Sequence, residues 1–213
     1  MNTFDLSLYL VTDRKMAGEL SLEHIVEEAV KGGVTMVQIR EKDCSTLDFV
    51  NYAINFHKFL KPLGIPMIIN DRLDVALASD AEGLHIGQND MPYSITRKLL
   101  GPDKIIGLSV ENMDEVKYAN KLDVDYIGIS PVFLTDTKTD TAAPFGIEGI
   151  KKVSALTLHP AVAIGGIHDF NVRQVISAGA DGVAVVSEII ASKNPYMAAK
   201  SLKEKIMVTK NNS

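Results

Sequence analysis

The sequence has almost no cysteine and no long apolar segment. Its single cysteine, Cys44, permits no internal disulfide, so nothing indicates an oxidising compartment. No apolar run reaches membrane-spanning length, and Asp5, Asp13 and Arg14 interrupt the apolar start of the chain. We therefore expect no signal peptide, no membrane partner and a cytoplasmic location.

Concentrated charge and linker-like segments are also missing. The formal net charge is -5, and the 22 lysines and arginines are dispersed, which argues against a protein that holds nucleic acid by its phosphates. No Pro/Gly/Ser-rich stretch divides the 213 residues, so we expect one domain over 1–207 and a polar, fraying tail at 208–213. The sequence leaves the oligomeric state open, a homo-oligomer included.

Short apolar runs alternate regularly with amphipathic segments. The runs predict strands at 8–11, 36–40, 67–69, 84–86, 105–110, 126–130, 161–164 and 182–186. Helical spacing of apolar residues predicts helices near 22–30, 45–63, 73–80, 95–100, 111–120, 147–156, 172–176 and 195–206. A similar sequence recurs before several strands, at 32–34, 81–83, 124–126 and 180–182. Eight short strands favour a closed (β/α)8 TIM barrel over an open doubly wound sheet.

Two consecutive predicted strands end in polar clusters led by a carboxylate. Asp71 follows the strand at 67–69, and Asp90 follows the strand at 84–86. The carboxyl ends of parallel strands share one edge, so the two carboxylates should meet there. Such a pair suits Mg²⁺, which takes one or two carboxylates together with substrate phosphate oxygens. In the alternative, Asp71 caps the next helix and Asp90 shapes a turn, and this stretch alone leaves both interpretations open.

The strand at 36–40 runs into a second polar cluster. Gln38, Arg40 and Lys42 occupy alternate positions, so they share a face and are expected to point together into the mouth of the barrel. Two cations and an amide suit a polyphosphate ligand. The alternative is a surface salt-bridge cluster with Glu41.

Candidate phosphate-binding turns follow the last two strands. Gly165-Gly166 and Val186-Ser187 each precede a helix, where TIM barrels often bind phosphate. Simple turn glycines are the alternative. The segment 131–146 is the longest without helical or strand periodicity and is predicted to be a binding loop.

Within that loop, Lys138 could reach a leaving phosphate, while Thr135 and Thr137 offer hydroxyls to a second ligand. His85 lies inside a predicted strand and is expected to pack or hydrogen-bond within the barrel. The other four histidines are expected at the surface or at helix caps. No Ser-His-Asp set or Cys/His metal spacing emerges.

Seven motifs together resemble the thiamine-phosphate synthase family. They are QIREK at 38–42, IINDR at 68–72, GLHIGQND at 83–90, GLSV at 107–110, TDTK at 135–138, AIGGI at 163–167 and VVS at 185–187. The resemblance covers almost the whole chain. It implies a transferase of thiamine biosynthesis that joins a pyrimidine methyl diphosphate to a thiazole phosphate and releases pyrophosphate.

The resemblance also implies residue roles. The pyrimidine diphosphate would be held by Gln38, Ile39, Arg40, Glu41, Lys42, Asn70, Ser109 and Lys138. The thiazole phosphate would be held by Thr135, Asp136, Thr137, Gly165, Gly166, Val186 and Ser187. Mg²⁺ would be bound by Asp71 and Asp90. The residues expected to act on the departing diphosphate are Arg40, Lys42, Ser109 and Lys138.

Two other functions remain as alternatives. A thiazole tautomerase is an isomerase relative with a similar barrel but no need of a diphosphate site, and the site here looks complete. A non-catalytic phosphate-ligand binder is the alternative from another class, because a fold does not determine function.

Overall fold

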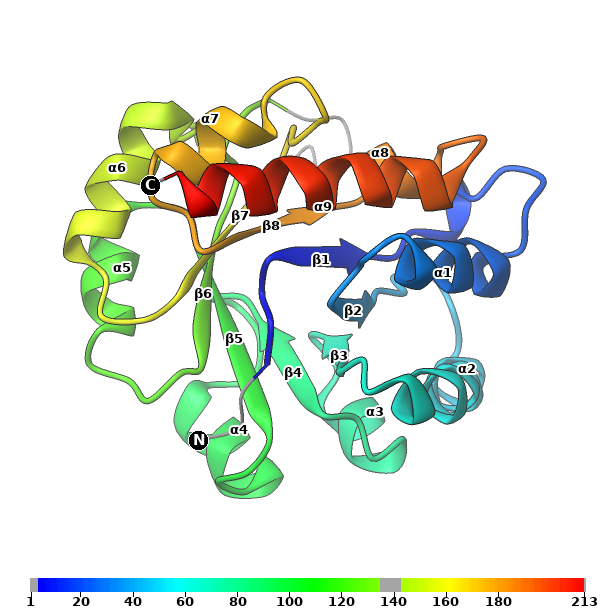
Figure 1. The fold of residues 1–213 in the computed structure, drawn as a ribbon. Coiled ribbons are helices and arrows are strands. Elements are labelled where there is room, and N and C mark those ends of the chain that lie inside the picture. The colour runs from blue at the N-terminus through cyan, green and yellow to red at the C-terminus, as the bar shows by residue number, and fades with distance from the viewer. Residues whose placement is uncertain (1–3, 135–142, 213) are drawn as a thin grey trace.

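Eight parallel strands close into a barrel in which each strand pairs with its neighbours in chain order. The computed structural model describes residues 4–134 and 143–212 (Figure 1). The strands are β1 Leu8–Val11, β2 Met36–Ile39, β3 Met67–Asn70, β4 Gly83–Ile86, β5 Ile105–Val110, β6 Tyr126–Ile129, β7 Ala161–Ile164 and β8 Gly182–Val185. The predicted (β/α)8 barrel is confirmed.

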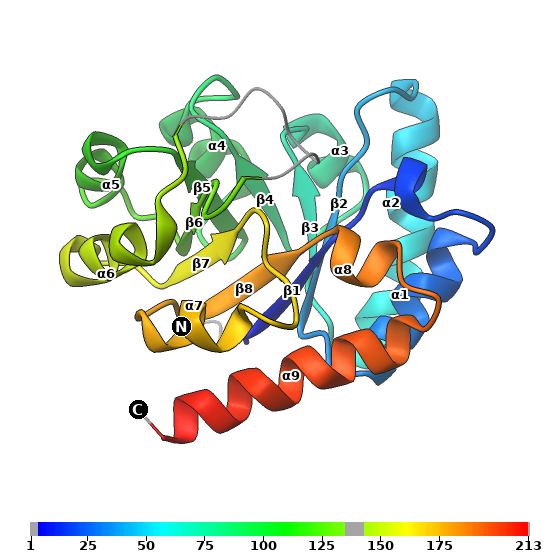
Figure 2. The ribbon, with the colours of Figure 1, turned by 90° about the horizontal axis from the view of Figure 1, so that it is seen from above.

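Helices cover the outside of this barrel (Figures 1 and 2). They are α1 Leu22–Lys31, α2 Thr46–Leu60, α3 Leu73–Ala78, α4 Tyr93–Leu100, α5 Met113–Ala119, α6 Gly146–Leu156, α7 Val172–Ser177, α8 Ser187–Ile190 and α9 Pro195–Asn211, with short 3-10 turns η1 Arg14–Met16 and η2 Lys61–Leu63. The sequence did not predict α8, a single turn directly after β8. Within the described ranges, no helix combines the length and apolar character needed to cross a bilayer.

Two apolar layers hold the barrel together. The larger layer lies between the strands and the helices, and the smaller one fills the barrel interior. Because side chains alternate across a strand, every second residue points inward. Tyr9 of β1, Met36 of β2 and Tyr126 of β6 point inward and are almost fully buried. The next inward position along each strand therefore lies nearer the carboxyl rim.

The last helix extends further than the sequence predicted. Helix α9 lies along the outside of the barrel between α1 and α7 (Figures 1 and 2). It continues to Asn211, so the predicted tail at 208–213 begins inside the helix. Thr209 is buried and donates a hydrogen bond of 2.7 Å to the Lys205 carbonyl, and the Lys210 ammonium reaches a loop carbonyl before β8. These contacts hold the final turn against the body of the protein.

Carboxylates at the amino-terminal end of the barrel account for three of the four recurring sequences before strands, those before β4, β6 and β8. Glu82, Asp125 and Asp181 directly precede β4, β6 and β8. Each accepts the backbone N–H of a residue at the start of the preceding strand: Met67 at 3.0 Å, Ile106 at 2.8 Å and Ala161 at 2.8 Å. The repeated acidic position thus links adjacent strands where the helix-to-strand loops enter the barrel.

The prediction for His57 is wrong. His57 was expected at the surface or at a cap, but its side chain is buried and lies 2.9 Å from Glu82. The helical spacing did not reveal this partner, because Glu82 lies 25 residues further along the chain.

Asp125 provides a test of these links. Its carboxylate accepts the Ile106 N–H and also pairs with the Arg97 guanidinium at 2.8 Å. We expect Asp125→Asn to lower the free energy of unfolding by about 1–3 kcal/mol, because it weakens a charge-assisted contact and leaves a backbone donor poorly paired. Urea unfolding measures the change. The exposed neighbour Asp123 is the matched control, and an equal loss in Asp123→Asn would contradict this account.

Candidate active site

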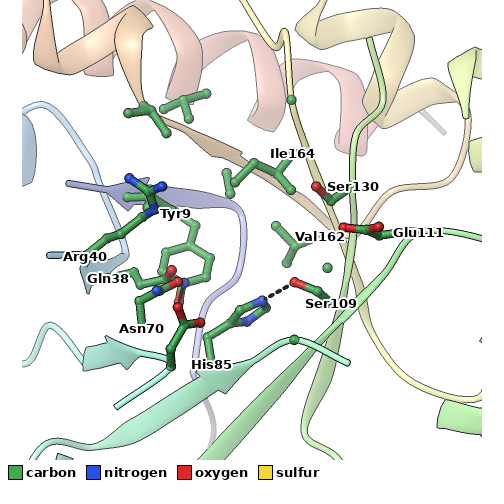
Figure 3. Close-up of a pocket in the computed structure, with 18 of the residues that line it drawn as sticks. Tyr9, Gln38, Arg40, Asn70, His85, Ser109, Glu111, Ser130, Val162 and Ile164 are labelled. Atoms are coloured by element: carbon green, nitrogen blue, oxygen red, sulfur yellow. Dashed lines mark hydrogen bonds between the residues drawn. The ribbon is translucent and has the colours of Figure 1, made fainter. Parts of the chain in front are cut away.

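A cavity of about 490 Å³ lies at the carboxyl ends of the strands. All eight strands, or the loops directly after them, contribute to its wall. Figure 3 shows side chains from opposite sides of the barrel converging on this space. The inward alternation of each strand accounts for the lining, since residues on the interior face and just beyond the strand end supply most of it.

The predicted cationic side chains line one wall of this cavity. Gln38, Arg40 and Lys42 all face it from the end of β2 and the loop that follows. Gln38 donates a hydrogen bond of 2.8 Å to the Tyr9 hydroxyl, and the Arg40 guanidinium lies 3.3 Å from the Asp13 carboxylate. The prediction that alternate residues point together into the barrel mouth is confirmed.

The two residues between them face elsewhere. Ile39 is fully buried in the layer between strands and helices. Glu41 turns to Arg14, with 2.9 Å between its carboxylate and the guanidinium. Neither side chain lines the cavity, which is the physical consequence of the same alternation. Glu41 therefore forms a salt bridge as the alternative expected, but with Arg14, whereas Arg40 and Lys42 pair with Asp13 and Asp71 beside the cavity.

Asp71 and Asp90 also line the cavity, from adjacent strands β3 and β4. Burial raises the pKa of Asp71, but hydrogen bonds with Lys42 and Asp90 more than offset this and hold it below its usual value. Burial raises the pKa of Asp90, and the neighbouring Asp71 carboxylate adds to that rise. Each carboxyl group thus influences the pKa of the other, as expected of two carboxylates that meet at one edge of the barrel.

The interpretation of Asp71 as a helix cap is wrong. Arg72 occupies the N-cap of α3, and that helix has no side-chain cap. Asp71 instead adopts a left-handed backbone conformation with φ 62°, which is uncommon for residues other than glycine, and its carboxylate pairs with the Lys42 ammonium. Asp90 does have a turn contact, since it accepts the Gly87 N–H at 2.7 Å.

The donor set fits a hard cation bound together with a phosphate. Among the described residues, no group of three or more His, Cys, Asp or Glu side chains is arranged to hold a metal by itself. Mg²⁺ does not require such a group, because it keeps several waters and takes oxygens from one or two carboxylates and from phosphate. Asp71 and Asp90 could hold it on those terms.

Asn70 and Ser109 are also exposed to the cavity. Asn70 is buried, and its Nδ2 is a buried polar atom without a hydrogen-bond partner in the described structure. An unpaired buried donor is costly unless a ligand satisfies it. The Ser109 hydroxyl lies 2.8 Å from His85 Nε2 (Figure 3). Both residues line the cavity, and the diphosphate-binding role that the resemblance implies for them stays a prediction.

The turn after β7 forms another part of the wall. Gly165 and Gly166 have φ of 101° and 63°, and a Cβ on either would lie within 3.0 Å of Pro131 or Phe133. Neither amide donates a hydrogen bond to any described residue. Both glycines line the cavity, together with Val186 and Ser187. The arrangement suits an anion.

Comparison with known proteins relates the chain to a family. A sequence model of the family described as thiamine monophosphate synthase matches residues 8–189. A thiamine-phosphate synthase of Albidiferax ferrireducens is 52% identical over 94% of this chain and 92% of that protein. One from Clostridium novyi is 45% identical, over 92% of this chain and 96% of that protein. The chain belongs to the thiamine monophosphate synthase family.

A solved structure agrees with this assignment. The thiamine phosphate pyrophosphorylase from Pyrococcus furiosus has a TM-score of 0.88 to this chain at 34% identity, covering 96% of each chain. The resemblance to the thiamine-phosphate synthase family is thereby confirmed.

Four residues with a predicted binding or catalytic role lie outside the described structure: Thr135, Asp136, Thr137 and Lys138. Their proposed roles remain predictions.

Several cavity residues were not predicted as site residues. Tyr9, His85 and Tyr126 form the floor, and Glu111 and Ser130 line the cavity near Ser109 (Figure 3). Burial lowers the pKa of His85 to about 4, so the ring is neutral near pH 7. The signal that could have found the floor residues is position, since each occupies the inward-facing set of its strand.

The pairing of Lys42 with Asp71 generates a direct prediction. In the metal-free protein, Lys42→Met should raise the pKa of Asp71, because burial and the Asp90 carboxyl group remain while the cation is lost. Carbon-13 NMR titration of the carboxyl groups measures the shift. Lys15→Met is the matched control, because that lysine pairs with Asp43 on the surface. An unchanged Asp71 titration in Lys42→Met would show that the ion pair does not set the pKa.

Proposed function

We propose that this protein is a Mg²⁺-dependent thiamine-phosphate synthase. It joins 4-amino-2-methyl-5-(diphosphooxymethyl)pyrimidine to 4-methyl-5-(2-phosphooxyethyl)thiazole and releases pyrophosphate. The observation that carries the proposal is the distribution of charge around one cavity. Cations and a carboxylate pair lie near the ends of β2 to β4, and backbone amides that have no partner among the described residues lie across the barrel after β7.

The cationic wall would bind the diphosphate. Arg40 and Lys42 offer fixed positive charge, and Asn70 and Ser109 offer neutral donors beside them. Mg²⁺ held by Asp71 and Asp90 would supply further neutralisation of the charge that develops on the departing diphosphate. Arg40 and Lys42 orient that group so that its charge is met when the carbon–oxygen bond breaks.

The second substrate would occupy the opposite wall. Amides of Gly165 and Gly166 suit the thiazole phosphate, which places the thiazole nitrogen toward the middle of the cavity. That nitrogen captures the cation-like methylene carbon left by the diphosphate. The reaction needs no side-chain nucleophile, and the exposed Cys44 is not among the residues lining the cavity. A cavity of about 490 Å³ is within the range that accommodates small-molecule ligands.

Pyrophosphate release is the direct test of this proposal. Purified protein given both substrates and Mg²⁺ should release pyrophosphate and form thiamine phosphate. Calorimetry adds a second measurement, in which the pyrimidine diphosphate should bind with Mg²⁺ and not without it. A folded protein that interconverts tautomers of the thiazole phosphate yet ignores the pyrimidine diphosphate would instead be a tautomerase. Binding without turnover would indicate a non-catalytic binder.

The carboxylate pair should act as a unit. We expect Asp71→Asn and Asp90→Asn each to lower kcat/KM by about 100-fold or more, because a bound cation contributes several kcal/mol to charge stabilisation. Asparagine is chosen since it tolerates the left-handed conformation of Asp71. The double variant should be nearly as active as the worse single variant, and excess Mg²⁺ should partly rescue the single variants.

The matched control for this cycle is Asp43→Asn, an exposed carboxylate outside the cavity. It should leave the kinetics unchanged. Small, additive losses that do not depend on Mg²⁺ would mean that the pair shapes the backbone and binds no metal.

A further inference from the structure

A continuous chain of side-chain hydrogen bonds crosses the floor of the cavity. Gln38 Nε2 donates to the Tyr9 hydroxyl at 2.8 Å, and that hydroxyl lies 2.9 Å from the Tyr126 hydroxyl. Tyr126 lies 2.9 Å from His85 Nδ1, and His85 Nε2 lies 2.8 Å from Ser109 Oγ. The five residues come from β2, β1, β6, β4 and β5, and both ends of the chain face the cavity.

With Nε2 of the Gln38 amide facing Tyr9, the direction of each further bond follows once every buried hydroxyl proton is given an acceptor. An amide nitrogen can only donate, so the Tyr9 oxygen accepts from Gln38. Among the described residues, the acceptor left for the Tyr9 proton is the Tyr126 oxygen, and the acceptor left for the Tyr126 proton is His85 Nδ1. The imidazole consequently has its proton on Nε2 and donates it to Ser109 Oγ.

This direction prevents the Ser109 hydroxyl from donating to the imidazole. A serine hydroxyl can rotate and can donate or accept. Here the oxygen already accepts from the imidazole, so the remaining proton points away from the floor and is available to a ligand in the cavity. Neutral donors of this kind stabilise developing negative charge when they are oriented in advance.

We propose that Tyr126 and His85 are positioning residues that fix the Ser109 hydroxyl as a donor to the bound diphosphate substrate. This inference rests on the proposed function for the identity of the substrate. The chain of hydrogen bonds itself does not depend on it.

Packing around the two rings gives independent support. The rings of His85 and Tyr126 stack with 5.5 Å between centroids and 30° between planes. A Cβ on Gly107 would lie 2.1 Å from Tyr126 Cζ and 2.5 Å from His85 Nδ1, so β5 needs glycine at this inward position. Gly128 lies beside the same imidazole, where a Cβ would approach Cε1 to 3.2 Å. Glycine inside a strand often marks such a close approach.

Histidine NMR tests the direction of the chain without any measurement of activity. Nitrogen-15 spectra of the labelled protein near neutral pH should show His85 as the tautomer with its proton on Nε2, with the signal assigned by its absence in His85→Gln. Tyr126→Phe removes the donor to Nδ1 and should abolish this preference. A wild-type ring that has its proton on Nδ1, or on both nitrogens, would overturn the inference whether or not the protein is a synthase.

Kinetics test whether the chain acts through Ser109. We expect Tyr126→Phe to lower kcat/KM about tenfold in the wild-type background, the equivalent of one hydrogen bond, and to have almost no effect in a Ser109→Ala background. Additive losses would show that Tyr126 has only a structural role. Tyr118→Phe, an exposed tyrosine on α5, is the matched control and should change nothing.

A comparison of two His85 variants gives a further test, which remains informative if another variant is unstable. His85→Gln retains an amide donor near the position of Nε2, whereas His85→Leu has none. We expect His85→Gln to recover most of the kcat/KM that His85→Leu loses, with circular dichroism showing equal folding. Equal activity of two folded variants would overturn the positioning role.

Discussion

Closure of parallel strands into a ring is the constraint on which the rest of this molecule depends. It brings every strand's carboxyl end to one rim, and the two-residue period of a strand then decides which side chains reach the cavity. By this rule Gln38, Arg40 and Lys42 line the cavity. Ile39 packs outward, and Glu41 pairs with Arg14. At the opposite, amino-terminal end of the barrel, carboxylates such as Asp125 accept a backbone N–H of the preceding strand and so link adjacent strands.

The charged side chains at the rim pair with one another, and a charged ligand could take the place of these partners. Lys42 pairs with Asp71, and Asp71 in turn interacts with Asp90, whose pKa is raised by burial and by its neighbour. Under the proposed function, a diphosphate that arrives with Mg²⁺ would offer Lys42 an anion and would offer the two carboxyl groups a cation. Both sets of groups would then keep partners of opposite charge, so binding would not leave a buried charge unpaired. Asp71 has a left-handed backbone conformation, and such strained conformations are often found at binding sites.

Much of this arrangement could be predicted from the sequence, because its signals are local or periodic. Strand and helix alternation gave the barrel, and parallel-strand geometry brought Asp71 and Asp90 together. The rest depends on contacts between residues distant in the chain. The floor formed by Tyr9, His85 and Tyr126 joins three strands through ring packing that no short motif encodes. The single turn α8 is too short for a helical period to be visible.

A crystal structure with Mn²⁺ and pyrophosphate would test the central claim most directly. Mn²⁺ accepts the same carboxylate, water and phosphate ligands as Mg²⁺, and its anomalous signal locates it unambiguously. The account predicts one metal peak between the carboxyl groups of Asp71 and Asp90, with pyrophosphate oxygens in its coordination shell and Arg40 and Lys42 on the same anion. Pyrophosphate bound away from these residues, or an Asp71 still paired with Lys42 and no metal beside it, would contradict the account.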